Sequence, residues 1–546
     1  MSVAKASDRR LPNPLAMRGL TSNTLILLAV VWVVGVANLS FFGNVLKTYG
    51  TTPAKLPALL SLMLAFGALN VLLAGLVAFG RATKLALIFF LLLSSLTAYF
   101  MDSFGVVIND EMLNNVVQTN PAEARDLINL RLFGYLLGLG VLPAWFVGRI
   151  PLVWRGWRIE LIARLRLLAL ALIAIVGPVL LFGGFYASFV REHKPLRSYA
   201  NPAYPLYSLV KYARGRLGSK ADKTIQPIGL DARIPRADPH RELVILVVGE
   251  TARADHFSLN GYGRETNPLL SQEPGVISFG DFHACGTSTA VSVPCMFSLQ
   301  GSNGNAEGQE SLLDVVKRAG VAVLWLDNNS DSKGVALRVP YQDYRSPEVN
   351  TVCDIECRDE GMLMPLQAYI DSHPQGDILI VLHQMGNHGP AYYKRYPAAF
   401  ERFKPTCQNN DLSQCTAQEI INAYDNALLY TDYFLAKTIE LLKRNSDRFE
   451  TALFYVSDHG ESLGEGGTWL HGLPRAIAPR AQLHVPALMW FGGHHHEVDV
   501  AALRAKRNAP YSHDHLFHTV LGFFEIETAI YRPELDILTD ARKGDW

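Results

Sequence analysis

Five long apolar stretches before residue 190 constrain the fold of this chain more than any other feature of its sequence. They cover residues 24–42, 56–79, 85–100, 132–147 and 167–185. A helix needs about 20 apolar residues to cross the hydrocarbon core of a bilayer, so the third and fourth stretches are short for a span. No small-residue cleavage site follows the first stretch, which indicates a retained helix rather than a signal peptide. The sequence therefore predicts an N-terminal transmembrane domain of five helices over residues 1–190.

Charge in the connections predicts the orientation of these helices. Basic residues gather in the N-terminal tail and after the second and fourth stretches, as Lys5, Arg9, Arg10, Arg18, Arg81, Lys84, Arg149, Arg155, Arg158, Arg164 and Arg166. The connection after the third stretch is acidic and carries Asp102, Asp110, Glu111, Glu123 and Asp126. Because Lys and Arg favour the cytoplasmic side, the N-terminus is expected inside. An odd number of spans then places everything after residue 185 outside the cytoplasm.

Residues 191–240 are expected to join the membrane domain to a second domain at residues 241–546. Residues 201–218 mix Tyr204, Tyr207 and Tyr212 with Lys211, Arg214 and Arg216, a composition that suits a helix lying in the lipid headgroup layer. An ordinary exposed linker explains the same residues equally well. Residues 222–239 are polar and contain proline, which is typical of a linker.

The second domain has the pattern of an α/β fold. Strands are predicted at residues 243–248, 321–326, 378–383, 452–456 and 485–490, and helices at 311–319 and 421–443. The strand candidates are almost continuously apolar, as expected for a parallel sheet with helices on both faces. The formal net charge of the whole chain is zero. We therefore expect no basic surface for nucleic acid.

All six cysteines lie in this second domain, at positions 285, 295, 353, 357, 407 and 415. Their spacing makes Cys285–Cys295, Cys353–Cys357 and Cys407–Cys415 the most economical pairing. Six cysteines allow about 15 pairings, and the sequence does not choose between them. An even count in one domain indicates an oxidising compartment, with buried thiols in a cytosolic enzyme as the alternative.

Polar residues follow several of the predicted strands. Glu250 follows the first strand, His388 lies shortly after the third, and Asp458 and His459 follow the fourth. Ligands of open α/β sheets bind at these carboxyl ends. Two carboxylates and an imidazole suit zinc, with manganese as a weaker possibility, although each residue alone could be a helix cap or a satisfied loop residue.

A hydroxyl-rich segment could supply a nucleophile for such a metal. Thr287, Ser288 and Thr289 precede an apolar stretch that could begin a helix. The free N–H groups of a helix N-terminus attract phosphate, and a metal lowers the pKa of a bound hydroxyl. A simple helix cap without chemistry remains the alternative for this segment.

Several segments together resemble one known family. They are residues 248–255, 285–297, 327–334, 384–390 with 392–397, and 457–462. These segments are similar to those of the lipid A phosphoethanolamine transferases, which include the mobile colistin-resistance enzymes, and the resemblance extends over essentially the whole chain. That family belongs to the alkaline phosphatase/sulfatase superfamily, and the resemblance implies this fold for the second domain.

The resemblance also implies roles for individual residues. The zinc ligands would be Glu250, Thr289, Asp458 and His459, with Thr289 as the phosphorylated nucleophile. Contacts to phosphoethanolamine or to a second zinc ion would come from Ser330, Lys333, His388 and His471. Contacts to the donor headgroup would come from Asn115, Thr119 and Glu123. Pro121 interrupts any helix near those three residues, and a surface helix with no such role is the local alternative.

The implied reaction is a double displacement in the periplasm of a Gram-negative bacterium. Phosphatidylethanolamine would donate phosphoethanolamine to Thr289, and lipid A would then accept it. The enzyme would be a multi-pass inner-membrane protein in contact with membrane lipids. It would act as a monomer and would confer resistance to polymyxins.

Four other functions remain open at this point. The acceptor could be a core sugar of lipopolysaccharide or a periplasmic glucan, or the chain could transfer phosphoglycerol. A sulfatase needs a Cys or Ser followed by Pro and Arg, and Thr289 lacks that signature. The alternative outside the enzymes is a non-catalytic membrane sensor or binding protein whose site has lost its activity.

Overall fold

The computed structural model describes residues 19–119, 121–218, 225–235, 240–304, 308–493 and 497–543. The basic tail with Lys5, Arg9, Arg10 and Arg18, and parts of the predicted linker, lie outside these residues. The chain divides into two compact units. One comprises Met1–Asp102 with Leu130–Tyr207, and the other comprises Ser103–Asn129 with Ser208–Trp546. Apart from Asp102, the acidic connection after the third apolar stretch thus belongs to the second unit, although the sequence places it within the membrane half.

The described part of the first unit is helical. Its helices are α1 (Ser22–Val36), α2 (Leu39–Tyr49), α3 (Leu56–Val77), α4 (Ala82–Phe104), α7 (Leu130–Tyr135), α8 (Leu142–Arg149), α9 (Trp157–Leu181), α10 (Gly183–Arg191), α11 (Lys194–Ser198) and the start of α12 (Ala203–Gly218). A π-helical turn, Leu136–Val141, joins α7 and α8. Among described residues, 3 helices are long and apolar enough to cross a membrane, or up to 5 if each bent pair counts as one span. Five spans therefore fit the structure.

Two of the predicted spans are bent rather than continuous. The pair α1 and α2 bends by 55°, and the pair α9 and α10 bends by 97°. Asn38 lies at the first break, where its side-chain amide donates hydrogen bonds to the carbonyls of Val33 and Asn201, both at 2.9 Å. Pro178 lies within the last turn of α9 and cannot donate a backbone hydrogen bond. The second break thus has a local cause in the sequence, whereas the first also involves a contact with the distant residue Asn201.

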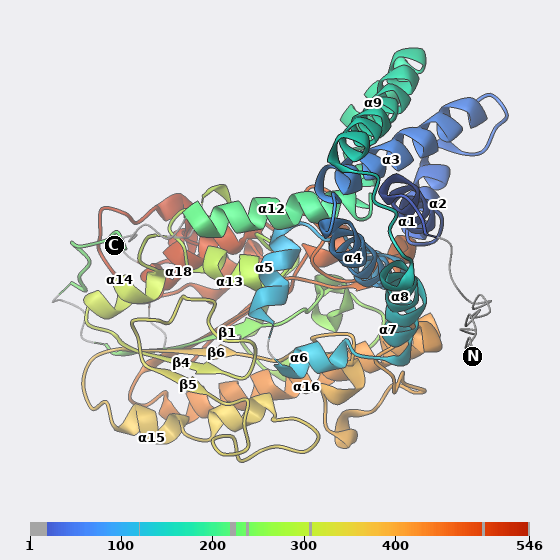
Figure 1. Ribbon diagram of the computed structural model, residues 1–546. Helices are drawn as coiled ribbons and strands as arrows, with labels where there is room; N and C mark the ends of the chain where they lie inside the picture. The colour runs from blue at the N-terminus through green and yellow to red at the C-terminus, as the bar shows by residue number, and fades with distance from the viewer. Residues whose placement is uncertain are drawn as a thin grey trace, which may run out of the picture. The chain divides into compact units, whose positions relative to one another are not determined.

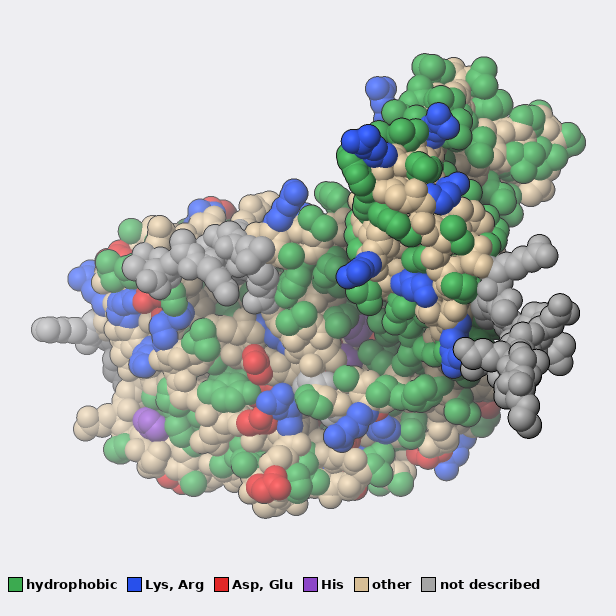
Figure 2. Space-filling model, in the orientation of Figure 1, with side chains coloured by type: hydrophobic (Ala, Val, Ile, Leu, Met, Phe, Trp, Pro, Cys, Tyr) green, Lys and Arg blue, Asp and Glu red, His purple; other side chains and the backbone are tan. Residues whose placement is uncertain are grey.

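Apolar side chains cover much of the outer surface of these helices (Figure 2). Val31, Leu76, Leu85, Leu180 and Leu181 are each more than two thirds exposed. Exposed apolar surface of this extent marks a membrane or partner surface in a folded protein. The first unit is accordingly built to face lipid.

The second unit contains one large sheet. Its strands are β1 (Glu242–Gly249), β2 (Ile277–Phe279), β4 (Ala322–Asp327), β5 (Tyr341–Asp343), β6 (Ile378–His383), β7 (Glu450–Ser457) and β10 (Ala487–Phe491). They form a 7-stranded sheet in the order β2-β10-β7-β1-β6-β4-β5. Among these strands, β10 pairs antiparallel with both β7 and β2, and all the other pairs are parallel. The prediction of a mainly parallel α/β sheet is confirmed.

Helices cover both faces of the sheet (Figure 1). One face packs on α13 (Thr289–Met296), α14 (Leu312–Arg318) and α18 (Leu516–Phe523). The other face packs on α15 (Leu366–Asp371) and α16 (Ala417–Asn445). Successive residues of β1 alternate between these two cores, and all eight residues of the strand are buried. Strands buried on both faces explain the continuous apolar runs in the sequence.

Smaller elements complete the unit. They are α5 (Asp110–Gln118), α6 (Pro121–Asp126), β3 (Phe282–His283), β8 (Ser462–Leu463), β9 (Trp469–Leu470), α17 (Val500–Ala505), β11 (Tyr511–Ser512) and the rest of α12. The structure forms the disulfides Cys285–Cys295, Cys353–Cys357 and Cys407–Cys415, which is the pairing of nearest cysteines.

Candidate active site

The carboxyl ends of β1 and β7 bring three candidate metal ligands together. These strands pair in parallel, with Gly249 opposite Ser457, so the residues that follow them meet at one edge of the sheet. Glu250, Asp458 and His459 are buried there, and each offers a ligand atom within 4.8 Å of the others. His459 Nε2 lies 3.3 Å from Glu250 Oε1 and 3.4 Å from Asp458 Oδ2.

Thr289 joins this cluster from the first turn of α13. Its side-chain hydroxyl donates to Glu250 Oε2 at 3.0 Å, and Oγ1 lies 3.4 Å from His459 Nε2. Ser288 precedes the helix and makes no side-chain cap bond. The Cys285–Cys295 disulfide ties the loop before α13 to the last turn of the helix. Of the three hydroxyls considered in the sequence, Thr289 is the one that reaches the cluster, because the hydroxyl of Thr287 donates to the Leu473 carbonyl.

The electrostatics of the cluster favour a bound cation. Burial and the adjacent Glu250 raise the pKa of Asp458 to about 7. Burial opposes charge on His459, but Asp458 and Glu250 outweigh it and raise the pKa of that imidazole to about 10. Burial likewise acts against the Glu250 carboxylate, yet His459 holds its pKa well below the usual range. Two buried carboxylates thus demand a positive charge, which a proton on His459 or a metal ion can supply.

An unpaired ligand atom supports the metal. Asp458 Oδ2 is buried and has no hydrogen-bond partner among the described residues. Its other oxygen accepts backbone N–H bonds from Thr251 at 3.2 Å and from His459 at 2.7 Å. Oxygen and imidazole ligands around one point suit a divalent ion of the zinc type. The residues present therefore fit a metal.

Two residues that the sequence analysis did not single out hold Glu250 in place. Asn329 Nδ2 donates to Glu250 Oε2 and to the Gln384 carbonyl, both at 2.7 Å. The hydroxyl of Thr251 donates to Glu250 Oε1. Thr251 has a φ of 58°, in the left-handed region that is costly for a β-branched residue. Both residues lie inside the segments that resemble the family, but only the fold shows that they contact Glu250.

Lys333 and Ser330 lie after β4, beside the cluster. Lys333 Nζ donates to the Ser330 carbonyl at 2.7 Å and to the Gln118 carbonyl at 3.3 Å. Burial lowers the pKa of Lys333. Asp331 and Lys333 both adopt positive φ, at 75° and 50°, so this turn is strained. Such strain concentrates at functional sites.

His388 and His471 complete the candidate set. The rings of His459 and His471 are 4.3 Å apart, and those of His388 and His471 are 5.4 Å apart. Burial and the neighbouring His459 lower the pKa of His471 to about 3. Burial also lowers the pKa of His388. Both rings are therefore neutral at pH 7, and a neutral imidazole can accept a hydrogen bond or bind a metal ion through its unprotonated nitrogen.

The segment 103–129 packs within the same unit as the cluster. Asn115 lies on α5, Thr119 follows that helix, and Pro121 begins α6. Glu123 is buried on α6, and its charge acts on both His388 and Lys333. The structure therefore brings Glu123 toward the predicted substrate contacts. The hydroxyl of Thr119 donates to the Asn115 carbonyl at 2.8 Å, and its part in binding stays a prediction.

A buried ion-pair network anchors this segment. Arg395 donates to Asp126 at 2.7 Å, to the His388 carbonyl at 2.6 Å and to Glu356. Lys394 donates to the other oxygen of Asp126 at 2.5 Å. Arg395 thus links the end of α6 to the backbone of His388.

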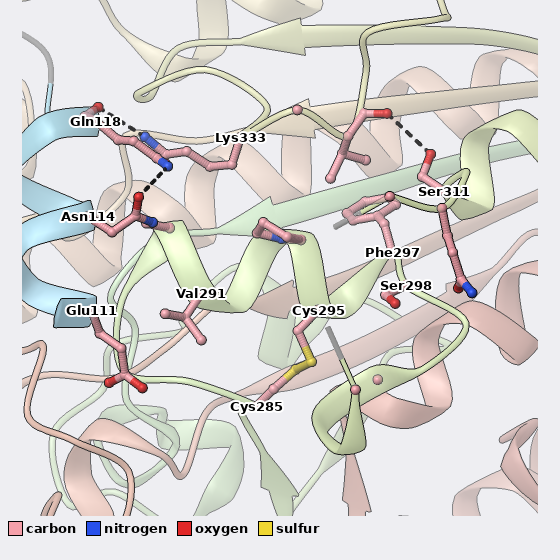
Figure 3. Close-up of a pocket in the computed structure, with 18 of the residues that line it drawn as sticks. Glu111, Asn114, Gln118, Cys285, Val291, Cys295, Phe297, Ser298, Ser311 and Lys333 are labelled. Carbon is pink, nitrogen blue, oxygen red and sulfur yellow. Dashed lines mark hydrogen bonds between the residues drawn. A yellow bond between two sulfur atoms is a disulfide. The ribbon is translucent and has the colours of Figure 1, made fainter. Parts of the chain in front are cut away.

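A cavity of about 1010 Å³ lies along α13 within this unit. Figure 3 shows Asn114 and Gln118 on α5 directed toward α13, with Lys333 close to Gln118. Gln118 Nε2 donates to Asn114 Oδ1 at 3.2 Å. Ala290, the residue that follows Thr289 on α13, also lines this space.

Comparison with known proteins agrees with this geometry. Residues 242–526 match the Sulfatase family, and residues 65–217 match the family described as phosphoethanolamine transferase EptA/EptB. The chain is 41% identical over 529 residues to the phosphatidylethanolamine transferase Mcr-1 of Escherichia coli, covering 93% of this chain and 96% of that protein. It is 38% identical over 534 residues to the phosphoethanolamine transferase EptA of Escherichia coli strain K12, covering 95% of this chain and 96% of that protein.

A solved structure is similar over nearly the full length. It is the integral membrane protein lipooligosaccharide phosphoethanolamine transferase A of Neisseria meningitidis, with a TM-score of 0.92 and 36% identity. The match covers 96% of this chain and 100% of that chain. The soluble domain of the same Neisseria protein matches with a TM-score of 0.56 and 42% identity, covering 59% of this chain and 99% of that chain.

Proposed function

Because the chain belongs to the phosphoethanolamine transferase family, we propose that it transfers phosphoethanolamine from phosphatidylethanolamine to a phosphate of lipid A. The observation that carries the proposal is the Thr289 hydroxyl, held 3.0 Å from Glu250 Oε2 at the first turn of α13. A hydroxyl in this place can act as a nucleophile toward phosphorus, and the helix N-terminus favours the phosphate charge.

Zinc is the metal that we assign to the cluster. Glu250, Thr289, Asp458 and His459 would hold it, and Asp458 Oδ2 is a ligand atom that otherwise accepts no hydrogen bond from the described residues. When bound, zinc supplies a positive charge that lowers the pKa of the Thr289 hydroxyl and offsets charge on the phosphate.

The first half of the reaction moves the group from lipid to protein. The Thr289 hydroxyl, which donates a hydrogen bond to Glu250 Oε2, gives up its proton, and its oxygen forms a bond to the donor phosphorus. The bond from phosphorus to the diacylglycerol oxygen breaks, and that oxygen takes up a proton. Lys333 faces the developing negative charge from its strained turn, and Glu123 is the carboxylate suited to the ammonium group of the donor.

The second half regenerates the hydroxyl. An oxygen of the acceptor phosphate attacks phosphorus and gives up its proton, the bond from phosphorus to Thr289 Oγ1 breaks, and Oγ1 takes up a proton. The neutral rings of His388 and His471 can accept hydrogen bonds from the transferred group, or can bind a second zinc ion. The new ammonium group on lipid A offsets its phosphate charge. Weaker attraction for cationic peptides, and thus polymyxin resistance, follows.

The helices of the first unit explain why this enzyme is fused to a membrane domain. Both substrates are lipids, and a catalytic unit held near the bilayer can reach a headgroup without extracting the lipid. We assign the protein to the inner membrane of a Gram-negative bacterium, with its catalytic unit in the periplasm, where three disulfides can persist. A monomer contains every residue of the proposed site.

Mass spectrometry of lipid A tests the function. Cells that express the wild-type chain are expected to carry phosphoethanolamine on lipid A phosphate, and cells that express Thr289→Ala are not. Modification of a core sugar or a periplasmic glucan instead would reassign the acceptor. Lipid modification by Thr289→Ala equal to wild type would refute the role of this threonine.

A further inference from the structure

The segment after β11 contacts both the loop before the nucleophile and the strand before the metal ligands. β11 pairs in parallel with β3, and this pairing places Ser512 opposite His283, two residues before Cys285. The next residue along the chain, His513, is fully buried. It lies outside the segments that resemble the family, and the sequence analysis did not single it out.

Both ring nitrogens of His513 have backbone partners. The N–H of Cys285 donates to Nδ1 at 3.1 Å, and Nε2 lies 2.9 Å from the carbonyl oxygen of Ser457. A carbonyl oxygen can only accept, so Nε2 carries the ring proton and Nδ1 is the acceptor. Burial lowers the pKa of His513 to about 4, so this neutral form is the one present at pH 7. The ring therefore joins two backbone segments through one donor and one acceptor.

These two backbone segments carry the two halves of the candidate site. Ser457 is the last residue of β7 and directly precedes the ligand Asp458. Cys285 begins the loop that leads to Thr289 at the start of α13. The Cys285–Cys295 disulfide joins this loop to α13 itself and does not reach β7. The imidazole of His513 therefore supplies a link between nucleophile and ligand strand that the disulfide cannot supply.

The neighbouring Asp514 holds the chain beyond the other end of α13. Its carboxylate accepts the backbone N–H of Ser302 at 2.6 Å and the hydroxyl of the same residue at 2.7 Å. Gly301 has a φ of 53°, and a side chain at this position would collide with the Asp514 carboxylate. Because α13 ends at Met296, residues 513 and 514 fix the chain both before and after the helix.

We propose that His513 is a positioning residue that holds Thr289 at the separation from Asp458 and His459 that the reaction requires. The inference rests on the proposed function and adds a residue that acts on the reaction through the backbone. Loss of the imidazole would leave a buried N–H and a buried carbonyl without these partners. The loop before α13 could then shift relative to the end of β7.

Steady-state kinetics of full-length protein in detergent micelles test this role. Release of labelled diacylglycerol is measured over a range of fluorescent phosphatidylethanolamine concentrations, which separates kcat from KM. His513→Phe keeps a buried ring and removes both hydrogen bonds. His518→Phe is the matched control, because His518 is likewise 1% exposed and its Nδ1 accepts one backbone N–H, that of Arg532 at 3.2 Å. Melting temperatures establish that each variant is folded.

The expected loss is in kcat. His513→Phe is expected to lower kcat about 100-fold, the loss that a misplacement of about 1 Å can cause, and to leave KM unchanged. His518→Phe is expected to keep the wild-type kcat. A kcat of His513→Phe equal to that of His518→Phe would overturn the inference. If His513→Phe does not fold, His513→Gln takes its place against His518→Gln.

A conservative variant tests the bond to Cys285 by rescue. His513→Asn places an amide oxygen near the position of Nδ1, where it can accept the Cys285 N–H. It is expected to have a kcat about tenfold above that of His513→Phe, as one restored hydrogen bond allows. Equal kcat in the two variants would show that this bond does not position Thr289.

Zinc affinity keeps the inference independent of turnover. Competition with a chromophoric chelator is measured on the same proteins, with zinc as the added metal. Because Thr289 is among the proposed ligands, His513→Phe is expected to bind zinc about tenfold more weakly than His518→Phe. Equal affinities would overturn the positioning role. If the wild-type protein releases no diacylglycerol, the proposed function fails, while the zinc titration still decides whether His513 positions the site.

Discussion

Removal of the Asn329 side-chain amide is expected to weaken metal binding without a large effect on the fold. Asn329 is fully buried, and its amide donates to Glu250 Oε2 and to the Gln384 carbonyl, both at 2.7 Å. Asn329→Leu keeps a similar volume and removes both donors. Glu250 then loses the bond that orients one of its two oxygens toward Thr289 and the metal position.

The size of the effect follows from the type of bond. A hydrogen bond to a carboxylate contributes about 1.5–3 kcal/mol. At about 1.4 kcal/mol per factor of ten, this corresponds to roughly 10- to 100-fold weaker metal affinity, the range typical of residues that orient a metal ligand. The bond to the Gln384 carbonyl contributes about 1 kcal/mol to stability rather than to metal binding.

Competition with a chromophoric zinc chelator measures this affinity on full-length protein in detergent. Asn350→Leu is the matched control, because Asn350 is also buried and donates to two carbonyls, those of Tyr344 at 3.0 Å and Arg358 at 2.9 Å. The control is expected to lose similar stability and to keep its zinc affinity. Equal zinc affinity in Asn329→Leu and wild type would show that Asn329 does not orient Glu250 for the metal.

Three further predictions concern the ion pairs of Arg395, the buried carboxyl group of Asp432 and the Cys285–Cys295 disulfide. Arg395→Met leaves Lys394 as the remaining cationic partner of Asp126. This variant is expected to lower the free energy of unfolding by about 3 kcal/mol and to raise the KM for phosphatidylethanolamine. An unchanged melting curve would contradict this expectation. Burial raises the pKa of Asp432 from 3.8 to about 7, so the stability from its protonated form is complete below pH 3.8 and is lost as pH rises toward 7. Asp432→Asn should therefore flatten the fall in melting temperature between pH 5 and pH 7, and an identical pH profile would exclude this account. Replacing Cys285 and Cys295 by Ser removes a disulfide between residues 10 positions apart. This double variant is expected to lower the free energy of unfolding by roughly 2.5 kcal/mol and to slow turnover at Thr289. Full activity together with the wild-type melting temperature would argue against this expectation.

The central strands of the catalytic unit could be predicted because each is buried on both faces. The strand predicted at residues 378–383 has the bounds of β6, whereas β1 and β7 each extend to an acidic residue, Glu242 and Glu450. From the sequence alone, a glutamate at the start of a strand is read as part of the preceding loop. Only the fold shows that Glu242 and Glu450 are both buried. The edge strands β2 and β5 have 3 residues each, too few for a periodic pattern.

The candidate ligands could be placed because they directly follow strands. Parallel pairing then brings Glu250 and Asp458 to one edge without further information. The residues that support the site could not be predicted in this way. Asn329 and Arg395 act through contacts between segments far apart in the chain. The bend after α1 depends likewise on Asn38 meeting Asn201. Such contacts leave no periodic signal in one sequence.

The covalent mechanism is tested by the mass of the peptide that contains Thr289, measured after the full-length protein is mixed with phosphatidylethanolamine without an acceptor. One phosphoethanolamine group is expected on Thr289, formed together with diacylglycerol and removed when lipid A is supplied. Diacylglycerol release from a protein whose Thr289 peptide never gains mass would contradict it.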